Sequence, residues 1–215
     1  MHTSKSSVGA ATREKFERRD WMVGLVGMAA RCVLRPRFKL VVQGAGQLPR
    51  QGSFLLLPKH QRWVDIPLLG LATPRPLYYI AKSELFAGSA ADWFIKSLGG
   101  IPLNRQRPIE SRRYLQRTEV LLHRGNNGVV IFPEGTYVIG RVGPGRTGVL
   151  KFILSRLRLP CIPVGIRYSE EGRRTRVRIR FGSAVLPEEN GPTASFVEDI
   201  MERISALSDL PRNSS

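Results

Sequence analysis

The residues best suited to acid–base chemistry in this sequence are a histidine and an aspartate five positions apart, His60 and Asp65. A short, continuous apolar run at 54–57 ends just before them and predicts a buried strand. Residues 63–72, rich in Ile and Leu, predict a helix that follows. His60 therefore lies between a strand and a helix, where open α/β sheets present reactive groups.

The separation of the two residues restricts how their side chains can meet. Along one continuous helix it turns through about 140°, so His60 and Asp65 would diverge. They meet when His60 lies in the turn and Asp65 lies in the first helical turn, where a carboxylate can fix the imidazole tautomer and stabilise the imidazolium. The same spacing also fits an Asp that faces a helix dipole and a His satisfied in a loop. Spacing alone leaves both interpretations open.

Three further stretches follow in order: Gly-Gly-Ile-Pro-Leu-Asn-Arg at 99–105, Phe-Pro-Glu-Gly-Thr at 132–136, and a Pro-containing apolar strand at 159–166. Together with the H-x4-D pair they resemble the four blocks of the glycerolipid acyltransferases, the 1-acyl-sn-glycerol-3-phosphate (lysophosphatidate) acyltransferase family. The resemblance covers the range 38–185. An H-x4-D pair by itself is a weak signal, whereas four blocks in order are a strong one.

The resemblance implies a transfer of a fatty acyl chain from a thioester to the free hydroxyl of lysophosphatidate, which makes phosphatidic acid. It makes His60 the general base and Asp65 its orienting partner, and Arg105 the best candidate for the acceptor phosphate. The co-substrate would be acyl-CoA or acyl carrier protein, and we expect no metal and no other cofactor. The substrate-binding positions that it implies are Lys82, Gly99, Arg105, Glu134, Gly135 and Thr136.

One position departs from the family pattern. Many relatives have an Arg directly after F-P-E-G-T, and here Tyr137 occupies that position. Arg141 and Arg146 follow in the same loop, and either can substitute for the missing charge. The acceptor therefore stays open, with another lysolipid or glycerol-3-phosphate as alternatives. An acyl-CoA hydrolase and a non-catalytic membrane-binding module are the two rival functions.

The composition points to an anionic partner. The chain of 215 residues fits one domain, and its formal charge of +17 suits a phosphorylated substrate, an anionic membrane surface or nucleic acid. Scattered basic residues, few aromatic residues and no recognised motif argue against nucleic acid. The two cysteines, Cys32 and Cys161, fall in apolar segments, and we expect buried free thiols in a reducing cytosol.

The N-terminal region suggests contact with a membrane surface. We expect a disordered tail at 1–12 and an amphipathic, membrane-associating helix within 13–37. Its apolar centre at 21–30 is too short to span a bilayer, which needs about 20 residues, and basic residues lie on both sides. The predicted location is the cytoplasmic face of the cell membrane, peripheral or monotopic. Packing over the domain's own core is the other interpretation, and both can hold for different faces.

The remaining chain, 38–210, forms the acyltransferase domain. Strands alternate with helices, which predicts an α/β, single-domain sandwich with a mixed sheet flanked by helices. Arg176, Arg178 and Arg180 alternate with apolar residues, and we interpret them as an edge strand kept soluble by charge rather than as a lipid-headgroup site. The expected strands are 38–43, 54–57, 77–81, 101–104, 129–132, 161–168 and 176–181, and the expected helices are 63–72, 90–98, 110–124, 147–157 and 192–207.

Overall fold

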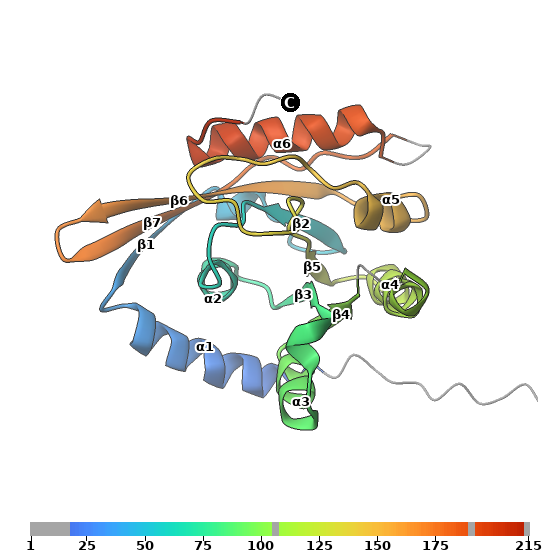
Figure 1. Cartoon of the computed structure of the whole chain (residues 1–215), viewed down its shortest axis with the longest axis horizontal. Coiled ribbons are helices and arrows are strands. Elements are labelled where there is room, and N and C mark those ends of the chain that lie inside the picture. Colours follow the sequence, from blue (N-terminus) through green and yellow to red (C-terminus); the bar gives the residue numbers. More distant parts are fainter. Residues whose placement is uncertain (1–17, 105–107, 189–191, 213–215) are drawn as a thin grey trace, which may run out of the picture.

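A computed structural model describes residues 18–104, 108–188 and 192–212, and its centre is a seven-stranded sheet with helices on both faces (Figure 1). The order of the strands across the sheet is β1-β7-β6-β2-β5-β3-β4. The strands are β1 (Phe38–Gln43), β2 (Phe54–Pro58), β3 (Leu77–Lys82), β4 (Gly100–Leu103), β5 (Gly128–Val130), β6 (Cys161–Glu171) and β7 (Arg174–Phe181).

The helices form a layer on each side of the sheet. In Figure 1, α6 and α5 lie on one side and α2 and α1 on the other, while α3 and α4 lie near β4. The helices are α1 (Asp20–Leu34), α2 (Asp65–Ala72), α3 (Ser89–Ser97), α4 (Pro108–His123), α5 (Gly148–Leu154) and α6 (Ala194–Ser208). This arrangement confirms the predicted α/β sandwich.

The sheet is mixed, as predicted. Strands β6, β2, β5, β3 and β4 run parallel to one another, β7 is antiparallel to β6, and β1 is parallel to β7. The carboxyl ends of the five parallel strands therefore lie along one edge of the sheet. Open α/β sheets bind their ligands at that edge.

Strand β2 is apolar throughout because both of its faces are covered. Leu55 and Leu57 pack in the cluster that contains α5 and α6 side chains, whereas Phe54 and Leu56 pack in the cluster that contains α2. All four are completely buried. This two-sided burial is typical of a central parallel strand, and it gives the residues that follow β2 a rigid base.

Several predicted boundaries need correction. Helix α2 begins at Asp65 rather than at Trp63, because the Asp65 carboxylate accepts the backbone N–H groups of Gln61 and Arg62 and holds 61–64 in a turn. Strand β5 and helix α5 are shorter than expected. The tail expected at 1–12 and the helix residues expected at 13–17 lie outside the described residues, and α1 begins at Asp20.

The edge-strand interpretation of the arginine row was wrong. Strand β7 lies inside the sheet between β1 and β6, and β1 forms the edge. Arg176 pairs with Glu171, while Arg178 and Arg180 both pair with Asp209, the residue that ends α6. These three arginines therefore fasten β7 to neighbouring elements of the protein.

Helix α1 has one buried face and one exposed apolar face. Met22 and Leu34 are buried, and Leu34 belongs to the core cluster around α2. Trp21, Leu25 and Met28 lie on the opposite side and are 64%, 56% and 61% exposed. Cys32, which we expected to be buried, is exposed on α1, whereas Cys161 is buried as predicted and burial raises its pKa to about 12.

Candidate active site

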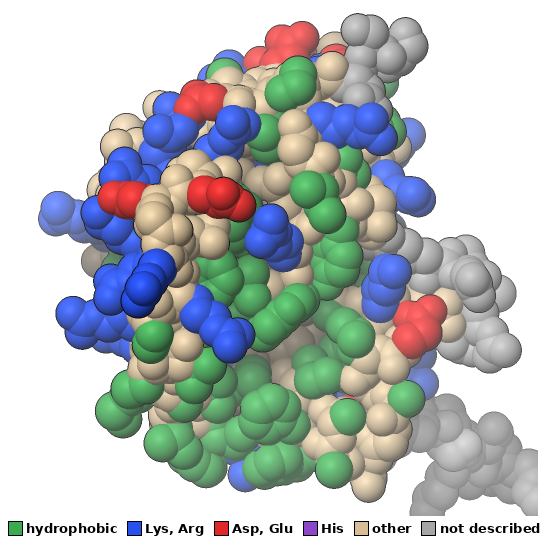
Figure 2. Space-filling view, turned by 60° about the vertical axis from the view of Figure 1, so that its left-hand side comes forward, with side chains coloured by type: hydrophobic (Ala, Val, Ile, Leu, Met, Phe, Trp, Pro, Cys, Tyr) green, Lys and Arg blue, Asp and Glu red, His purple; other side chains and the backbone are tan. Residues whose placement is uncertain are grey.

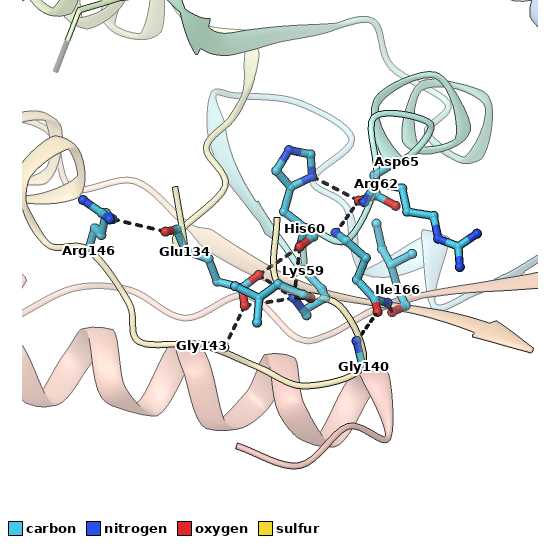
Figure 3. A network of polar contacts seen from close by, with 11 residues as sticks. Lys59, His60, Arg62, Asp65, Glu134, Gly140, Gly143, Arg146 and Ile166 are labelled. Atoms are coloured by element: carbon cyan, nitrogen blue, oxygen red, sulfur yellow. Dashed lines mark hydrogen bonds and ion pairs between the residues drawn. The ribbon is translucent and has the colours of Figure 1, made fainter. Parts of the chain in front are cut away.

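His60 and Asp65 meet as the sequence predicts for a turn followed by a helix. Nδ1 of His60 lies 3.0 Å from Oδ2 of Asp65 (Figure 3). His60 follows the carboxyl end of β2, and Asp65 is the first residue of α2. The contact leaves Nε2 of His60 as the nitrogen that can accept a proton, because a carboxylate partner holds the proton on Nδ1.

The Asp65 carboxylate is buried and both of its oxygens have donors. Oδ2 accepts the backbone N–H groups of Gln61 and Arg62 at 2.6 and 2.7 Å, in addition to His60. Oδ1 accepts the hydroxyl of Tyr168. Burial raises the pKa of Tyr168, and the nearby charge of Asp65 adds to the effect, so this phenol remains a proton donor. Asp65 is thus held in place by hydrogen bonds to both of its oxygens, with one of them against His60.

The imidazole of His60 contacts two aromatic rings. The Phe132 ring stacks on it at 3.7 Å between centroids, and the Tyr137 ring meets it edge-on at 4.4 Å. These contacts restrict rotation of the ring about its side-chain bonds. His60 is largely buried, and it lines a cavity at the carboxyl edge of the sheet.

A second polar pair, Lys59 and Glu134, lies directly behind His60. The Nζ of Lys59 contacts both carboxylate oxygens of Glu134, at 2.9 and 2.7 Å (Figure 3). Both residues are buried, Lys59 completely. Burial lowers the pKa of Lys59, and the hydrogen bond and charge of Glu134 oppose that shift.

The cavity next to His60 has a volume of about 960 Å³. Much of its wall is apolar, from Ile66 on α2, Leu103 on β4 and Phe152 on α5, among others. In the part of the chain that the structure describes, the lining residues run from His60 to Phe152. Such a wall suits an acyl chain, because hydrocarbon is transferred favourably from water into an apolar site.

The charged side chains of the cavity are cationic. Lys82 at the end of β3, Arg112 on α4 and Arg146 before α5 line it, and within the described ranges no Asp or Glu does. Arg146 also donates from Nε to the Glu134 carbonyl at 3.2 Å, which holds its stem in place. Arg141 does not line the cavity. The arrangement suits an anionic group such as a phosphate.

A metal site is not apparent in the parts of the chain that the structure describes, where no three His, Cys, Asp or Glu side chains lie together.

Comparison with known proteins places the chain in a family. The model of the family described as "Acyltransferase" matches residues 39–167, more than half of the 215 residues. The chain belongs to the acyltransferase family. The match includes β1 to β5 and most of β6, and with them His60, Asp65 and the cavity.

Two curated relatives are both 1-acyl-sn-glycerol-3-phosphate acyltransferases. The acyltransferase chain is 28% identical over 146 residues to a 1-acyl-sn-glycerol-3-phosphate acyltransferase of Bacillus subtilis (strain 168), which covers 67% of this chain and 71% of the relative. It is 24% identical over 143 residues to a protein of the same name from Streptococcus pneumoniae (strain ATCC BAA-255 / R6). That second match covers 65% of this chain and 53% of the relative.

A solved structure supports the fold. The 1-acyl-sn-glycerophosphate (LPA) acyltransferase PlsC from Thermotoga maritima superposes with a TM-score of 0.64 at 25% identity. The superposition covers 86% of this acyltransferase and 78% of that chain. Both the sheet and its flanking helices therefore follow an arrangement already found in this family.

Of the other residues expected to bind substrate, three line the cavity and Glu134 does not. Lys82, Gly135 and Thr136 line the cavity with His60. The Gly135 N–H donates to the Phe132 carbonyl at 3.0 Å, and its positive φ of 68° accounts for glycine at this turn. Glu134 contacts Lys59 and does not line the cavity.

Gly99 and Arg105 were also expected at the site. Gly99 lies at the opposite edge of the sheet, just before β4, with φ of 89°. A Cβ there would lie 2.9 Å from the Leu77 carbonyl oxygen, so this position is explained by backbone packing. Arg105 lies outside the described residues.

Sequence reasoning missed the functions of Lys59 and Tyr168 and the place of Arg112. Lys59 had one usable signal, since a lysine directly after a fully apolar strand must either leave the core or find a partner there. Tyr168 had none, because it ends the expected strand at 161–168 with nothing nearby in the sequence to pair with it.

Proposed function

We propose that this acyltransferase moves a fatty acyl chain from a thioester to the free hydroxyl of 1-acyl-sn-glycerol-3-phosphate, which yields phosphatidic acid for phospholipid biosynthesis. The observation that carries the proposal is the His60–Asp65 contact beside an apolar cavity with cationic groups. The names of the relatives from Bacillus subtilis, Streptococcus pneumoniae and Thermotoga maritima support the same substrate.

In the proposed reaction His60 is the general base. Its Nε2 takes the proton of the acceptor hydroxyl while that oxygen attacks the thioester carbonyl. A carbon–oxygen bond forms, the carbon–sulfur bond breaks, and the departing thiolate takes the proton back from His60. Asp65 stabilises the imidazolium that exists between these two proton transfers. Acyl-CoA or acyl carrier protein supplies the thioester, and no enzyme nucleophile is needed.

Phosphate recognition is assigned to the cations around the cavity. Arg146 and Lys82 lie on its wall, and Arg105 is the third candidate from the sequence motif. Arg146 supplies a charge close to the position where relatives have Arg in place of Tyr137. Guanidinium groups bind phosphate through paired hydrogen bonds, which favours arginine for this role.

The proposed location is a membrane surface, where the acceptor lysophosphatidate and the product phosphatidic acid are found. Figure 2 shows hydrophobic side chains gathered over the lower part of the molecule, where Figure 1 has α1 and α3, with Lys and Arg grouped to one side. Trp93 and Phe94 on α3 are also exposed, and the Arg19 guanidinium lies over the Trp93 ring. Apolar side chains with basic neighbours are typical of helices at the membrane interface. No helix in the described ranges is long and apolar enough to cross a bilayer.

The decisive experiment is an acceptor panel. Purified protein is incubated with labelled acyl-CoA and, in separate reactions, lysophosphatidate, other lysolipids, glycerol-3-phosphate or no acceptor, and the products are identified by mass spectrometry. We expect phosphatidic acid, with a loss of ~10²–10⁴ in kcat for His60→Ala and a comparable loss for Asp65→Asn. Free fatty acid formed equally well without acceptor would show a hydrolase. If product formed only from a different lysolipid, that lysolipid would be the acceptor instead of lysophosphatidate. Full activity of His60→Ala would overturn the mechanism.

A further inference from the structure

Lys59 is a fully buried lysine whose donors are all used inside the protein. Its Nζ contacts Glu134 Oε2 at 2.7 Å and Oε1 at 2.9 Å, the Val138 carbonyl at 2.6 Å and the His60 carbonyl at 3.1 Å. Neither Lys59 nor Glu134 lines the cavity. A lipid bound in the cavity would therefore not touch this pair directly.

The pair holds the backbone of the proposed base from both sides. Glu134 Oε2 accepts the His60 N–H at 3.1 Å, and Lys59 donates to the His60 carbonyl. The two peptide groups on either side of the His60 Cα are thus fixed by one ion pair. Because the imidazole position follows from the backbone position, this fixation sets the distance from His60 to Asp65.

The same pair also holds the loop at 138–143, which lies between cavity-lining residues. Glu134 Oε1 accepts the Gly143 N–H at 2.8 Å, and Lys59 donates to Val138, whose own N–H donates to the His60 carbonyl at 2.9 Å. Between these two points of attachment the loop runs from 138 to 143. Its flanking residues Tyr137 and Arg146 face the cavity.

We infer that Lys59 and Glu134 are positioning residues for His60, and that Glu134 acts through Lys59 and the His60 backbone rather than by binding substrate. The inference rests on the proposed acyl transfer. A buried ion pair is weak evidence for stability, since apolar residues of similar size often replace such a pair without loss. Apolar side chains cannot, however, accept from the His60 N–H and donate to the His60 carbonyl. The contribution of the pair is therefore geometric: it fixes the backbone of His60.

The test compares Glu134→Gln, Lys59→Met and the double variant with wild type, in kcat, in KM for each substrate and in melting temperature. We expect each single variant to lose about 10²-fold in kcat, the cost of a small displacement of a catalytic group, with both KM values unchanged. The double variant should lose no more than the worse single variant, because the two residues act as one unit. Losses that multiply in the double variant would overturn the inference. A raised KM for the acceptor in Glu134→Gln with kcat unchanged would do the same, since it would place Glu134 on the substrate.

A matched control uses an exposed ion pair away from the cavity, Arg203 and Asp199 on α6. Arg203→Met with Asp199→Asn removes the same two charges and should leave kcat unchanged. If Lys59→Met does not fold, Glu134→Gln decides the question by itself, because glutamine keeps the shape of the side chain.

A second measurement does not depend on activity. The Nδ1–H proton that His60 shares with Asp65 should give a downfield resonance in NMR spectra of wild type, assigned by its absence in His60→Ala. We expect Glu134→Gln to shift or broaden it while the remaining spectrum stays folded. An unchanged resonance would overturn the inference. If wild type transferred no acyl group to any acceptor, the proposed function would fail, and this resonance would still decide the role of the pair.

Discussion

The Tyr168 hydroxyl donates a hydrogen bond to Oδ1 of Asp65, the same carboxylate whose Oδ2 lies against Nδ1 of His60. Tyr168 is on β6 and lies 103 residues beyond Asp65 in the chain. The orientation of the carboxylate is thus set by a strand of the sheet as well as by its own turn. The Arg62 guanidinium lies over the Tyr168 ring, 4.7 Å from its centroid.

The first prediction concerns this phenol. Tyr168→Phe keeps the ring under Arg62 and removes only the donor to Asp65, so the carboxylate is less well oriented. We expect kcat to fall about tenfold, the effect of ~1.4 kcal/mol on the transition state, with both KM values unchanged. Steady-state kinetics with lysophosphatidate and acyl-CoA give the result. Unchanged kcat in a variant with the wild-type melting temperature would show that the Asp65 turn is sufficient.

The second prediction concerns the acceptor phosphate. Arg146→Ala removes a cation from the cavity wall and should raise KM for lysophosphatidate far more than KM for the acyl donor. Losing a charge-assisted hydrogen bond costs ~1.5–3 kcal/mol, or roughly 10- to 150-fold. Arg141→Ala, in the same loop but outside the cavity, is the control and should change neither KM. If Arg105→Ala carried the whole effect and Arg146→Ala none, the phosphate would bind on the Arg105 side.

The third prediction concerns the exposed face of α1. Replacing Trp21 and Leu25 with Ser should weaken binding to vesicles that contain anionic lipid without lowering the melting temperature, because both side chains are more than half exposed. High salt should weaken wild-type binding only in part, since the apolar contribution is not screened. Leu186→Ser, at a leucine that is 54% exposed after β7, is the control. A lower melting temperature with unchanged vesicle binding would make α1 a core element only.

The fourth prediction concerns acid stability. A hydrogen bond from Arg180, with the charges of Arg178 and Arg167 adding to it, holds the pKa of Asp209 below its usual value of about 3.9. The ion pairs of Asp209 therefore stabilise the fold fully when the pH is above the usual pKa of an aspartate. This stabilisation is lost as the pH falls through the lowered pKa of Asp209 in the folded protein. Urea midpoints between about pH 5 and pH 2 should therefore fall less steeply for Asp209→Asn than for wild type. Asparagine tolerates the left-handed backbone at this position, where φ is 49°. If the urea midpoint fell equally steeply with pH in both proteins, Asp209 would not contribute to acid unfolding.

Local patterns predicted the elements that depend on local contacts. The apolar run at β2 predicted a central strand because both faces of that strand are buried. The spacing of His60 and Asp65 predicted their contact because the turn between them is short and Asp65 itself caps it. These features need no information from distant parts of the chain.

The features that the sequence could not predict depend on partners far away in the chain. Lys59 and Glu134 are 75 residues apart and meet only because β2 and β5 pair in parallel. The alternation in β7 is the same for an edge strand and for an interior strand with one charged face. The neighbour that makes β7 an interior strand is β1, which begins at Phe38, far earlier in the chain. Residues so far apart in the chain form no repeating sequence pattern, so their contact cannot be predicted from local spacing.

Among the described residues, those that line the cavity come from one part of the chain, His60 to Phe152, whereas β1, β6, β7 and α6 supply the framework. The described residues that shape the cavity, and with it the choice of substrate, therefore lie in one contiguous segment of the chain. Recombination between family members at two crossover points, one between Lys59 and His60 and one after α5, would transplant the binding surface formed by these residues into this framework. Such a hybrid would have to keep Lys59 and Tyr168 from this chain matched to the incoming Glu134 and Asp65, because those two contacts cross the crossover points.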